Sequence, residues 1–149
     1  MEQEGDRMDY TNLAQEFMGI MGQMRKHNMH KPINDSMHGE IFVLLYISQH
    51  EDNVIPSEIS NEVGISTARV AATLNSLEKK GMITRKIDVN DRRRILVEIT
   101  TSGKELIEEH FKMIMKFTIN MLSYLGEEDA KEYVRIMKRL AERNPEHCP

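Results

Sequence analysis

Residues 55–81, IPSEISNEVGISTARVAATLNSLEKKG, contain two helical patterns separated by a short break. Pro56 suits the first turn of a helix, and the apolar residues that follow it are four apart on one face. Gly64 supplies a left-handed end to this helix, and Ser66 can cap a second, longer helix that a glycine ends. The spacing therefore predicts a short helix, a tight turn and a longer helix, which is the helix-turn-helix pattern.

After Gly81 the apolar period changes from 3.6 to 2, which indicates strands over residues 83–87 and 95–99. The polar residues 88–94 join these strands, so we expect a two-stranded hairpin. Three adjacent arginines, Arg92, Arg93 and Arg94, lie at its tip, and we interpret the neighbouring Asp88 and Asp91 as salt-bridged to them. A helix-turn-helix followed by a basic hairpin is a winged helix.

Apolar residues at spacings of three and four predict further helices over about residues 8–29, 36–50, 102–125 and 127–140. Ser102 and Glu105 have capping-box spacing at the start of the third of these. The expected fold is therefore mainly α with a small β-hairpin. We divide the chain into an N-terminal helix at 1–35, a winged helix-turn-helix at 36–101 and C-terminal helices at 102–149.

The charges are separated along the chain. The formal net charge is -4, yet residues 66–104 carry nine basic and four acidic residues, a net +5, so the remainder carries -9. A basic centre between acidic ends favours a polyanionic partner for the centre. The acidic N-terminus lacks a signal sequence, the apolar run 41–47 is too short to span a membrane, and Cys148 is the single cysteine. We therefore expect a cytoplasmic protein without a membrane partner.

The longer helix has the dimensions to enter the major groove of double-stranded DNA, where base edges are distinguishable. With its apolar stripe buried, the residues that face outward near its start are Ser66, Thr67, Ala68, Arg69, Ala72 and Thr73. Arg69 is the candidate base reader, and Ser66 offers the helix N-terminus to a phosphate. We interpret Asn75, Ser76, Lys79 and Lys80 as DNA-backbone contacts or solvated surface. The alternative is a winged-helix module that binds only protein.

The run LNSLEKKGMITRKIDVNDRRRILVEITTSGKEL, residues 74–106, resembles the signature of MarR-type regulators. The shared pattern is a leucine-spaced helix end, Gly, an apolar pair, Arg, D-x-x-D-x-R, an alternating strand, then Thr and Gly. The resemblance covers residues 36–106, and the flanking long helices occupy the places it requires. It implies a ligand-responsive repressor that binds an inverted repeat as a homodimer built from the terminal helices.

The resemblance also implies roles for the hairpin residues. It assigns Arg93 to the minor groove, Asp91 to bracing the turn, and Arg92 and Arg94 to flanking phosphates. The chain departs from the pattern at Ala72, where relatives often carry a polar or basic residue. Ala72 either makes an apolar contact with a thymine methyl group or makes no base contact. The operator sequence and the target genes therefore cannot be inferred from the family.

A small-molecule effector is the remaining implication of the resemblance. Ten of the twelve methionines lie outside residues 36–101, where they suit either an adaptable pocket or ordinary core packing. A zinc-sensing cluster is an alternative to solvated side chains, and Cys148 is a weak candidate for a thiol switch. The residues of that cluster are His27, His30, His38, Glu109 and His110. Without a tight ligand motif or a catalytic motif we expect no metal, no cofactor and no enzymatic activity.

Overall fold

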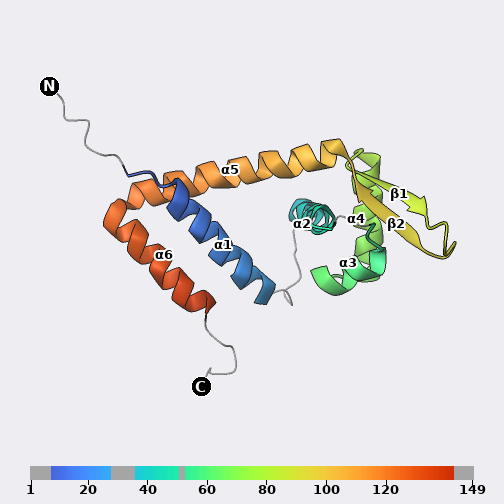
Figure 1. Ribbon diagram of the computed structural model, residues 1–149, viewed down its shortest axis with the longest axis horizontal. Helices are drawn as coiled ribbons and strands as arrows, with labels where there is room; N and C mark the ends of the chain where they lie inside the picture. The colour runs from blue at the N-terminus through green and yellow to red at the C-terminus, as the bar shows by residue number, and fades with distance from the viewer. Residues whose placement is uncertain (1–7, 28–35, 51–52, 143–149) are drawn as a thin grey trace, which may run out of the picture. The chain divides into compact units, whose positions relative to one another are not determined.

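The computed structural model describes residues 8–27, 36–50 and 53–142, without the side chains of 25–27 and 36–38. This part of the chain forms six helices and one antiparallel hairpin, as Figure 1 shows. In chain order the elements are α1 (Thr11–His27), α2 (Ser36–Ser48), α3 (Pro56–Val63), α4 (Thr67–Lys79), β1 (Ile83–Ile87), β2 (Ile95–Ile99), α5 (Thr101–Leu125) and α6 (Glu127–Ala141). The predicted fold class, mainly helical with a small hairpin, is confirmed.

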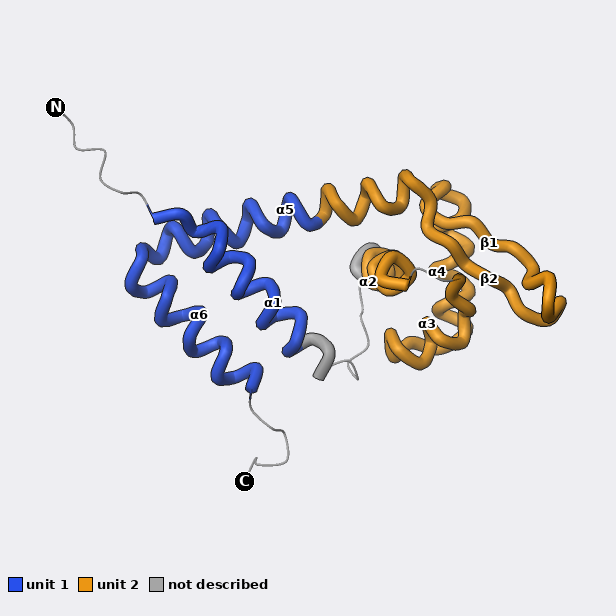
Figure 2. The backbone as a smooth tube through the Cα atoms, in the orientation of Figure 1, with its two compact units in different colours: residues 1–28, 111–149 blue, residues 29–110 orange. Residues whose placement is uncertain are grey.

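The chain divides into two compact units, which Figure 2 colours separately. Unit 2, residues 29–110, contains α2, α3, α4, the hairpin and the first part of α5. Unit 1, residues 1–28 and 111–149, contains α1, the rest of α5 and α6. The 25 residues of α5 therefore contribute to both units, and at 1.5 Å per residue this helix is about 37 Å long. A dimerisation role for the segments 1–35 and 102–149 stays a prediction.

The apolar core of unit 2 holds α3 and α4 in position. Val70, Leu74 and Leu77 form the buried stripe of α4, and Ile59 and Val63 form that of α3. Burying an aliphatic side chain of this size stabilises a fold by about 1.5–3 kcal/mol, so the two stripes hold both helices against α2. The rest of this core comes from α2, the hairpin, α5 and residue 54: Val43, Leu44, Ile47, Val54, Ile83, Val97 and Ile107.

The turn between α3 and α4 uses the residues that the sequence pattern indicates. Pro56 is the first residue of α3, and Gly64 ends this helix with a left-handed φ of 71°. Ser66 caps α4, because its side-chain oxygen accepts a hydrogen bond from the backbone N–H of Arg69 at 3.2 Å. The predicted helix-turn-helix is therefore confirmed, including the predicted capping residues Gly64 and Ser66.

Strands β1 and β2 pair antiparallel in the register Ile83↔Ile99, Arg85↔Val97 and Ile87↔Ile95. Ile83 and Val97 are buried, so these pairs lie on the face of the hairpin that packs on the helices. Val54 exchanges two backbone hydrogen bonds with Val97, at 3.2 and 2.8 Å, and so ties the segment before α3 to β2. The hairpin extends beyond the helices of unit 2 (Figure 1).

The start of α5 differs from the sequence expectation. Ser102 lies inside the helix, and Thr100 is the residue whose hydroxyl accepts a hydrogen bond from the N–H of Gly103, at 3.1 Å. The same hydroxyl donates to the carbonyl of Gly81 at 2.7 Å. The predicted capping box of Ser102 and Glu105 is therefore wrong, because the helix is capped two residues earlier by a threonine that also bonds to the end of the α4 turn.

Unit 1 has a separate apolar core, formed by Ala14, Phe17, Ile20, Leu122, Ala130 and Val134. The rings of Phe17 and Tyr133 lie 5.5 Å apart between centroids and join α1 to α6. Four methionines pack against this core: Met24, Met115, Met121 and Met137. These four methionines therefore follow the core-packing interpretation, whereas Met113 is 61 % exposed.

None of the helices in the described part of the chain combines the length and apolar character needed to cross a membrane.

Candidate nucleic-acid interface

The outward side of α4 carries the predicted reading residues. Thr67, Ala68 and Ala72 are exposed, while Arg69 and Thr73 are half-buried beside the stripe of Val70 and Leu74. Ser66 is exposed at the N-terminal end of the helix, where its oxygen is occupied by the cap. The free N–H groups of a helix N-terminus still favour an anion, so this end of α4 presents small side chains and a partial positive charge to a partner.

The C-terminal half of α4 is held to α2 by a polar contact that the sequence alone does not indicate. Glu40 accepts hydrogen bonds from the hydroxyl of Ser76 at 2.6 Å and from Nζ of Lys80 at 2.7 Å. Burial acts to raise the Glu40 pKa, but these two bonds and the Lys80 charge outweigh it and hold the pKa below its usual value. Ser76 and Lys80 therefore position α4 and are not merely solvated surface.

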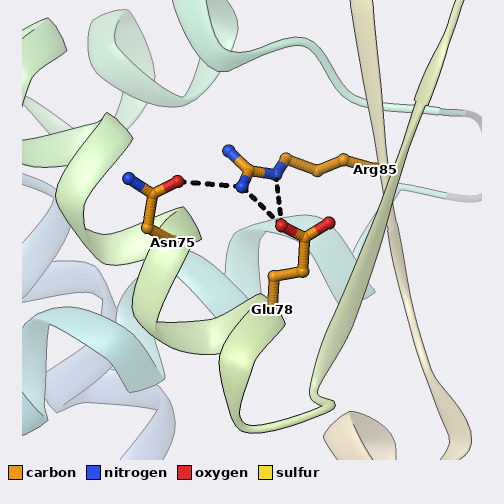
Figure 3. Close-up of polar contacts among 3 residues, drawn as sticks. All are labelled: Asn75, Glu78 and Arg85. Carbon is orange, nitrogen blue, oxygen red and sulfur yellow. Dashed lines mark hydrogen bonds and ion pairs between the residues drawn. The ribbon is translucent and has the colours of Figure 1, made fainter.

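A second contact joins α4 to the hairpin, as Figure 3 shows. Arg85 on β1 donates from Nε to Oε2 of Glu78 at 3.0 Å and from Nη2 to Oδ1 of Asn75 at 2.8 Å, and a further Nη2 bond reaches Glu78. The bond from Arg85 holds the pKa of Glu78 below its usual value, and the same bond raises the pKa of Arg85. These bonds link the C-terminal half of α4 to the first strand of the hairpin.

These partners cannot be predicted from local sequence patterns. Glu40 and Lys80 are 40 residues apart, and Asn75 and Arg85 lie on opposite sides of a turn, so no local spacing connects them. Of the four residues interpreted as DNA-backbone contacts or surface, Asn75, Ser76 and Lys80 have partners within the protein. Lys79 is exposed at the end of α4.

The wing tip is organised by backbone hydrogen bonds. The N–H of Asp88 donates to the carbonyl of Arg94 at 3.0 Å, and the N–H of Arg94 donates to the carbonyl of Asp91 at 2.9 Å. Oδ1 of Asp88 accepts from the N–H of Asn90 at 2.9 Å, and Oδ1 of Asp91 accepts from the N–H of Arg93 at 3.0 Å. Each aspartate therefore closes an Asx turn within the tip.

This arrangement corrects the interpretation of the two aspartates as salt-bridged. Within residues 53–142, no ion pair includes Arg92, Arg93 or Arg94, and Asp88 and Asp91 each accept a hydrogen bond from a backbone N–H. All three arginines are exposed, whereas Asp88 is only 9 % exposed. The tip therefore presents three exposed cations that form no ion pair within residues 53–142.

The alternative metal cluster falls largely outside the described residues. The side chains of His27, His30 and His38 are not described, and neither is Cys148. Glu109 is exposed and His110 is half-buried on α5. The described residues contain no group of three or more histidine, cysteine or acidic side chains arranged to hold a metal ion.

A short helix that ends at a glycine turn, a longer reading helix, and a basic hairpin locked to that helix define a winged helix-turn-helix protein. Residues 40–118 match the family model described as a winged helix DNA-binding domain. The chain belongs to this family, and the fold expected from the resemblance to MarR-type regulators is confirmed.

Curated relatives from Bacillus subtilis support the assignment. The chain is 33 % identical to the uncharacterized HTH-type transcriptional regulator YdgJ over 101 residues, 68 % of this chain and 60 % of YdgJ. It is 30 % identical to the uncharacterized HTH-type transcriptional regulator YwhA over 68 % of this chain and 72 % of YwhA. The chain spans about half to three-fifths of the length of YdgJ and of two further curated relatives, YwaE and YcgE. They are named as transcriptional regulators and not as enzymes.

Solved structures share the fold at low sequence identity. MepR, a transcription regulator of the Staphylococcus aureus multidrug efflux pump MepA, has a TM-score of 0.63 at 22 % identity, over 89 % of this chain and 96 % of MepR. Wild-type MarR from E. coli has a TM-score of 0.60 at 17 % identity over 89 % and 92 %. FabT from Streptococcus pneumoniae, solved in complex with DNA, has a TM-score of 0.56 at 22 % identity over 89 % and 94 %.

Proposed function

We propose that this protein is a sequence-specific DNA-binding transcriptional regulator that binds an inverted-repeat operator as a homodimer. The observation that carries the proposal is the wing tip, where three exposed arginines lack acidic partners in the described structure while Asp91 holds the Arg93 backbone. A phosphate polyanion offsets that repulsion on binding and releases its own counterions. The N-terminal side of α4 enters the major groove, and Arg93 enters the minor groove.

The composition of α4 restricts how sequence is read. Its outward residues are small except for Arg69, so direct hydrogen-bonded reading is concentrated on that side chain and on Thr67 and Thr73. Ala68 and Ala72 allow the helix to approach closely and to contact thymine methyl groups. Arg92 and Arg94 contact the phosphates on either side of the minor groove.

Homodimer formation is supported by unit 1, where large apolar side chains of α5 and α6 remain exposed. Phe117 is 69 % exposed and Tyr124 is 92 % exposed, and Phe111, Met113, Leu125, Ile136 and Leu140 are also exposed. So many exposed apolar side chains in one small unit are typical of an oligomer interface. A two-fold dimer presents two heads about 34–36 Å apart, which corresponds to one turn of DNA.

We further propose that the protein is a repressor released by a small ligand, does not catalyse a reaction and acts in the cytoplasm, where it has access to the chromosome. One curated relative is named as a transcriptional repressor, YetL from Bacillus subtilis, at 26 % identity. A ligand that binds the DNA-free conformation more tightly than the DNA-bound one lowers operator affinity by that ratio.

The experiment is a footprint over the DNA that flanks the protein's own gene, followed by affinity measurement on the protected duplex. Arg93→Ala is expected to weaken binding about 5- to 150-fold, because a good groove contact contributes about 1–3 kcal/mol. Lys131→Ala is the matched control, since it removes one positive charge from an exposed ion pair with Glu127 on α6. A winged-helix module that binds only protein leaves the duplex unprotected even at low salt.

A further inference from the structure

One pair of apolar residues on the wing is largely exposed in the described part of unit 2. Ile87 ends β1, Ile95 begins β2, and the register places them directly opposite each other. Ile87 is 64 % exposed and Ile95 is 44 % exposed. Directly opposite residues share one face of a hairpin, about 4.5–5.5 Å apart between Cβ atoms, so the two side chains form a single exposed apolar surface.

The face of the hairpin that carries this pair is the inner one. The pairs before it on the same face are Ile83↔Ile99 and Arg85↔Val97, of which Ile83 and Val97 are buried. Arg85 reaches Asn75 and Glu78 of α4, so α4 lies against this face. Ile87 and Ile95 therefore continue the inner face beyond α4, toward the tip.

The pair lies close to the arginine proposed for the minor groove. Arg93 precedes Ile95 by two residues, which limits their Cα separation to about 7 Å. The minor groove is about 6 Å wide, and its walls are the deoxyribose rings of the two strands. When Arg93 is inside the groove, the apolar pair is at the groove edge, where sugar carbons are the accessible surface.

We propose that Ile87 and Ile95 form a DNA-contact site that packs against deoxyribose at the edge of the minor groove, an inference that rests on the proposed function. The pair adjoins the arginine tip. The positive charge of this tip favours a polyanion as the partner over a second copy of this protein. Arg92, Arg93 and Arg94 are exposed beside it and would repel the same arginines of another wing. Other minor-groove binding proteins also place apolar side chains against DNA, where they are inserted between base steps.

Such a contact makes a distinct contribution to binding. Arginine contacts release counterions and weaken with salt, whereas apolar packing neutralises no phosphate and leaves the salt dependence unchanged. The proposal therefore separates two quantities that one experiment measures: the affinity at fixed salt, and the slope of log affinity against log salt concentration.

The test uses the full-length protein and a duplex of about 30 base pairs selected from a random library by the wild type, long enough for two half-sites. The variants are Ile87→Thr and Ile95→Thr, singly and together, and the corresponding valine variants. Threonine and valine keep the β-branched shape that strands favour. Thr84→Val, an exposed position on the other face of β1, is the matched control.

The double threonine variant is expected to bind at least about 16-fold more weakly with an unchanged salt slope, because each apolar carbon withdrawn from a contact weakens binding about fourfold and at least one is withdrawn at each of the two positions. The valine variants fall between it and the wild type, Thr84→Val binds like the wild type, and Arg92→Ala lowers the slope. Wild-type affinity in the double variant, or a slope that falls with its affinity, overturns the proposal. If the wild type selects no duplex, the proposed function itself fails, which is a different outcome.

Discussion

Replacement of Gly103 by alanine tests how the wing is joined to α5. A Cβ atom at this position would lie 2.3 Å from the carbonyl oxygen of Met82 and 2.7 Å from Cγ1 of Ile99. The Met82 carbonyl cannot move away freely, because it accepts a hydrogen bond from the N–H of Thr100 at 3.0 Å. The added Cβ atom therefore meets the backbone of Met82 before β1 and the side chain of Ile99 at the end of β2.

Two effects of opposite sign compete in Gly103→Ala. Alanine is favoured over glycine inside a helix by about 1 kcal/mol. Overpacking costs about 1–3 kcal/mol, and displacing the Met82 carbonyl weakens a hydrogen bond that contributes about 1 kcal/mol. The clash wins, so we expect a net loss of about 1–3 kcal/mol in the free energy of unfolding. For a chain of this length that lowers the melting temperature by roughly 2–12 °C.

The measurement is denaturant unfolding followed by circular dichroism at one fixed protomer concentration, since a dimer's apparent stability depends on concentration. Gly19→Ala and Gly22→Ala are the matched controls, because both lie in α1 and a Cβ atom at either has nothing within 4 Å. These two variants are expected to be about 0.5–1 kcal/mol more stable. If Gly103→Ala is as stable as the wild type or gains stability like the controls, the reasoning is refuted.

Three further predictions concern the interface and its support. Asp91→Ala is expected to weaken operator binding although it removes a negative charge near DNA, because the Arg93 N–H is left without its acceptor. Asp91→Asn keeps that acceptor and should bind at least as well as the wild type. A binding titration in which Asp91→Ala binds more tightly than Asp91→Asn would contradict this prediction. Glu40 has a folded-state pKa below its unfolded value near 4.3, so its stabilising contribution is present above that value and is lost as pH falls through the folded pKa. The difference in unfolding free energy between the wild type and Glu40→Gln should therefore narrow over this acidic range. A difference that stays constant in acid-unfolding curves would contradict this role of Glu40. The double variant Arg92→Ala, Arg94→Ala should lower the salt slope of binding by about 0.9 for each phosphate that it leaves unneutralised, and an unchanged slope would place these arginines off the phosphates.

The contact of Arg85 with Asn75 and Glu78 both stabilises unit 2 and positions the residues that we propose contact DNA. Glu78 and Asn75 lie on the part of α4 that the apolar stripe leaves outside the core, and Arg85 connects them to the strand that leads to the wing tip. A helix held by its apolar stripe alone can still rotate slightly about that stripe. The charged contact of Arg85, whose Nε and Nη2 both donate to Oε2 of Glu78, restricts this rotation.

Local patterns along the chain were sufficient to predict the elements of this protein. The change of period after Gly81, the apolar stripe of α4 and the caps at Gly64 and Ser66 each depend on residues within one or two turns, so the sequence contains the whole signal. The resemblance in residues 74–106 then predicted the family. The start of α5 was predicted wrongly because Thr100 is selected by its bond to Gly81, 19 residues earlier in the chain.

Contacts between distant residues were decided only by the tertiary structure. Sequence reasoning placed Asp88 and Asp91 beside arginines and inferred salt bridges, but the tip folds so that each carboxylate accepts a backbone N–H instead. Likewise, the partners of Ser76, Lys80 and Arg85 come from other elements. A carboxylate's partner depends on which donors folding brings within about 3 Å, and charge order along the chain does not determine that. The exposed pair Ile87 and Ile95 illustrates the same limit: alternation marks them as inward-facing, and only the length of α4 beneath the hairpin leaves them uncovered.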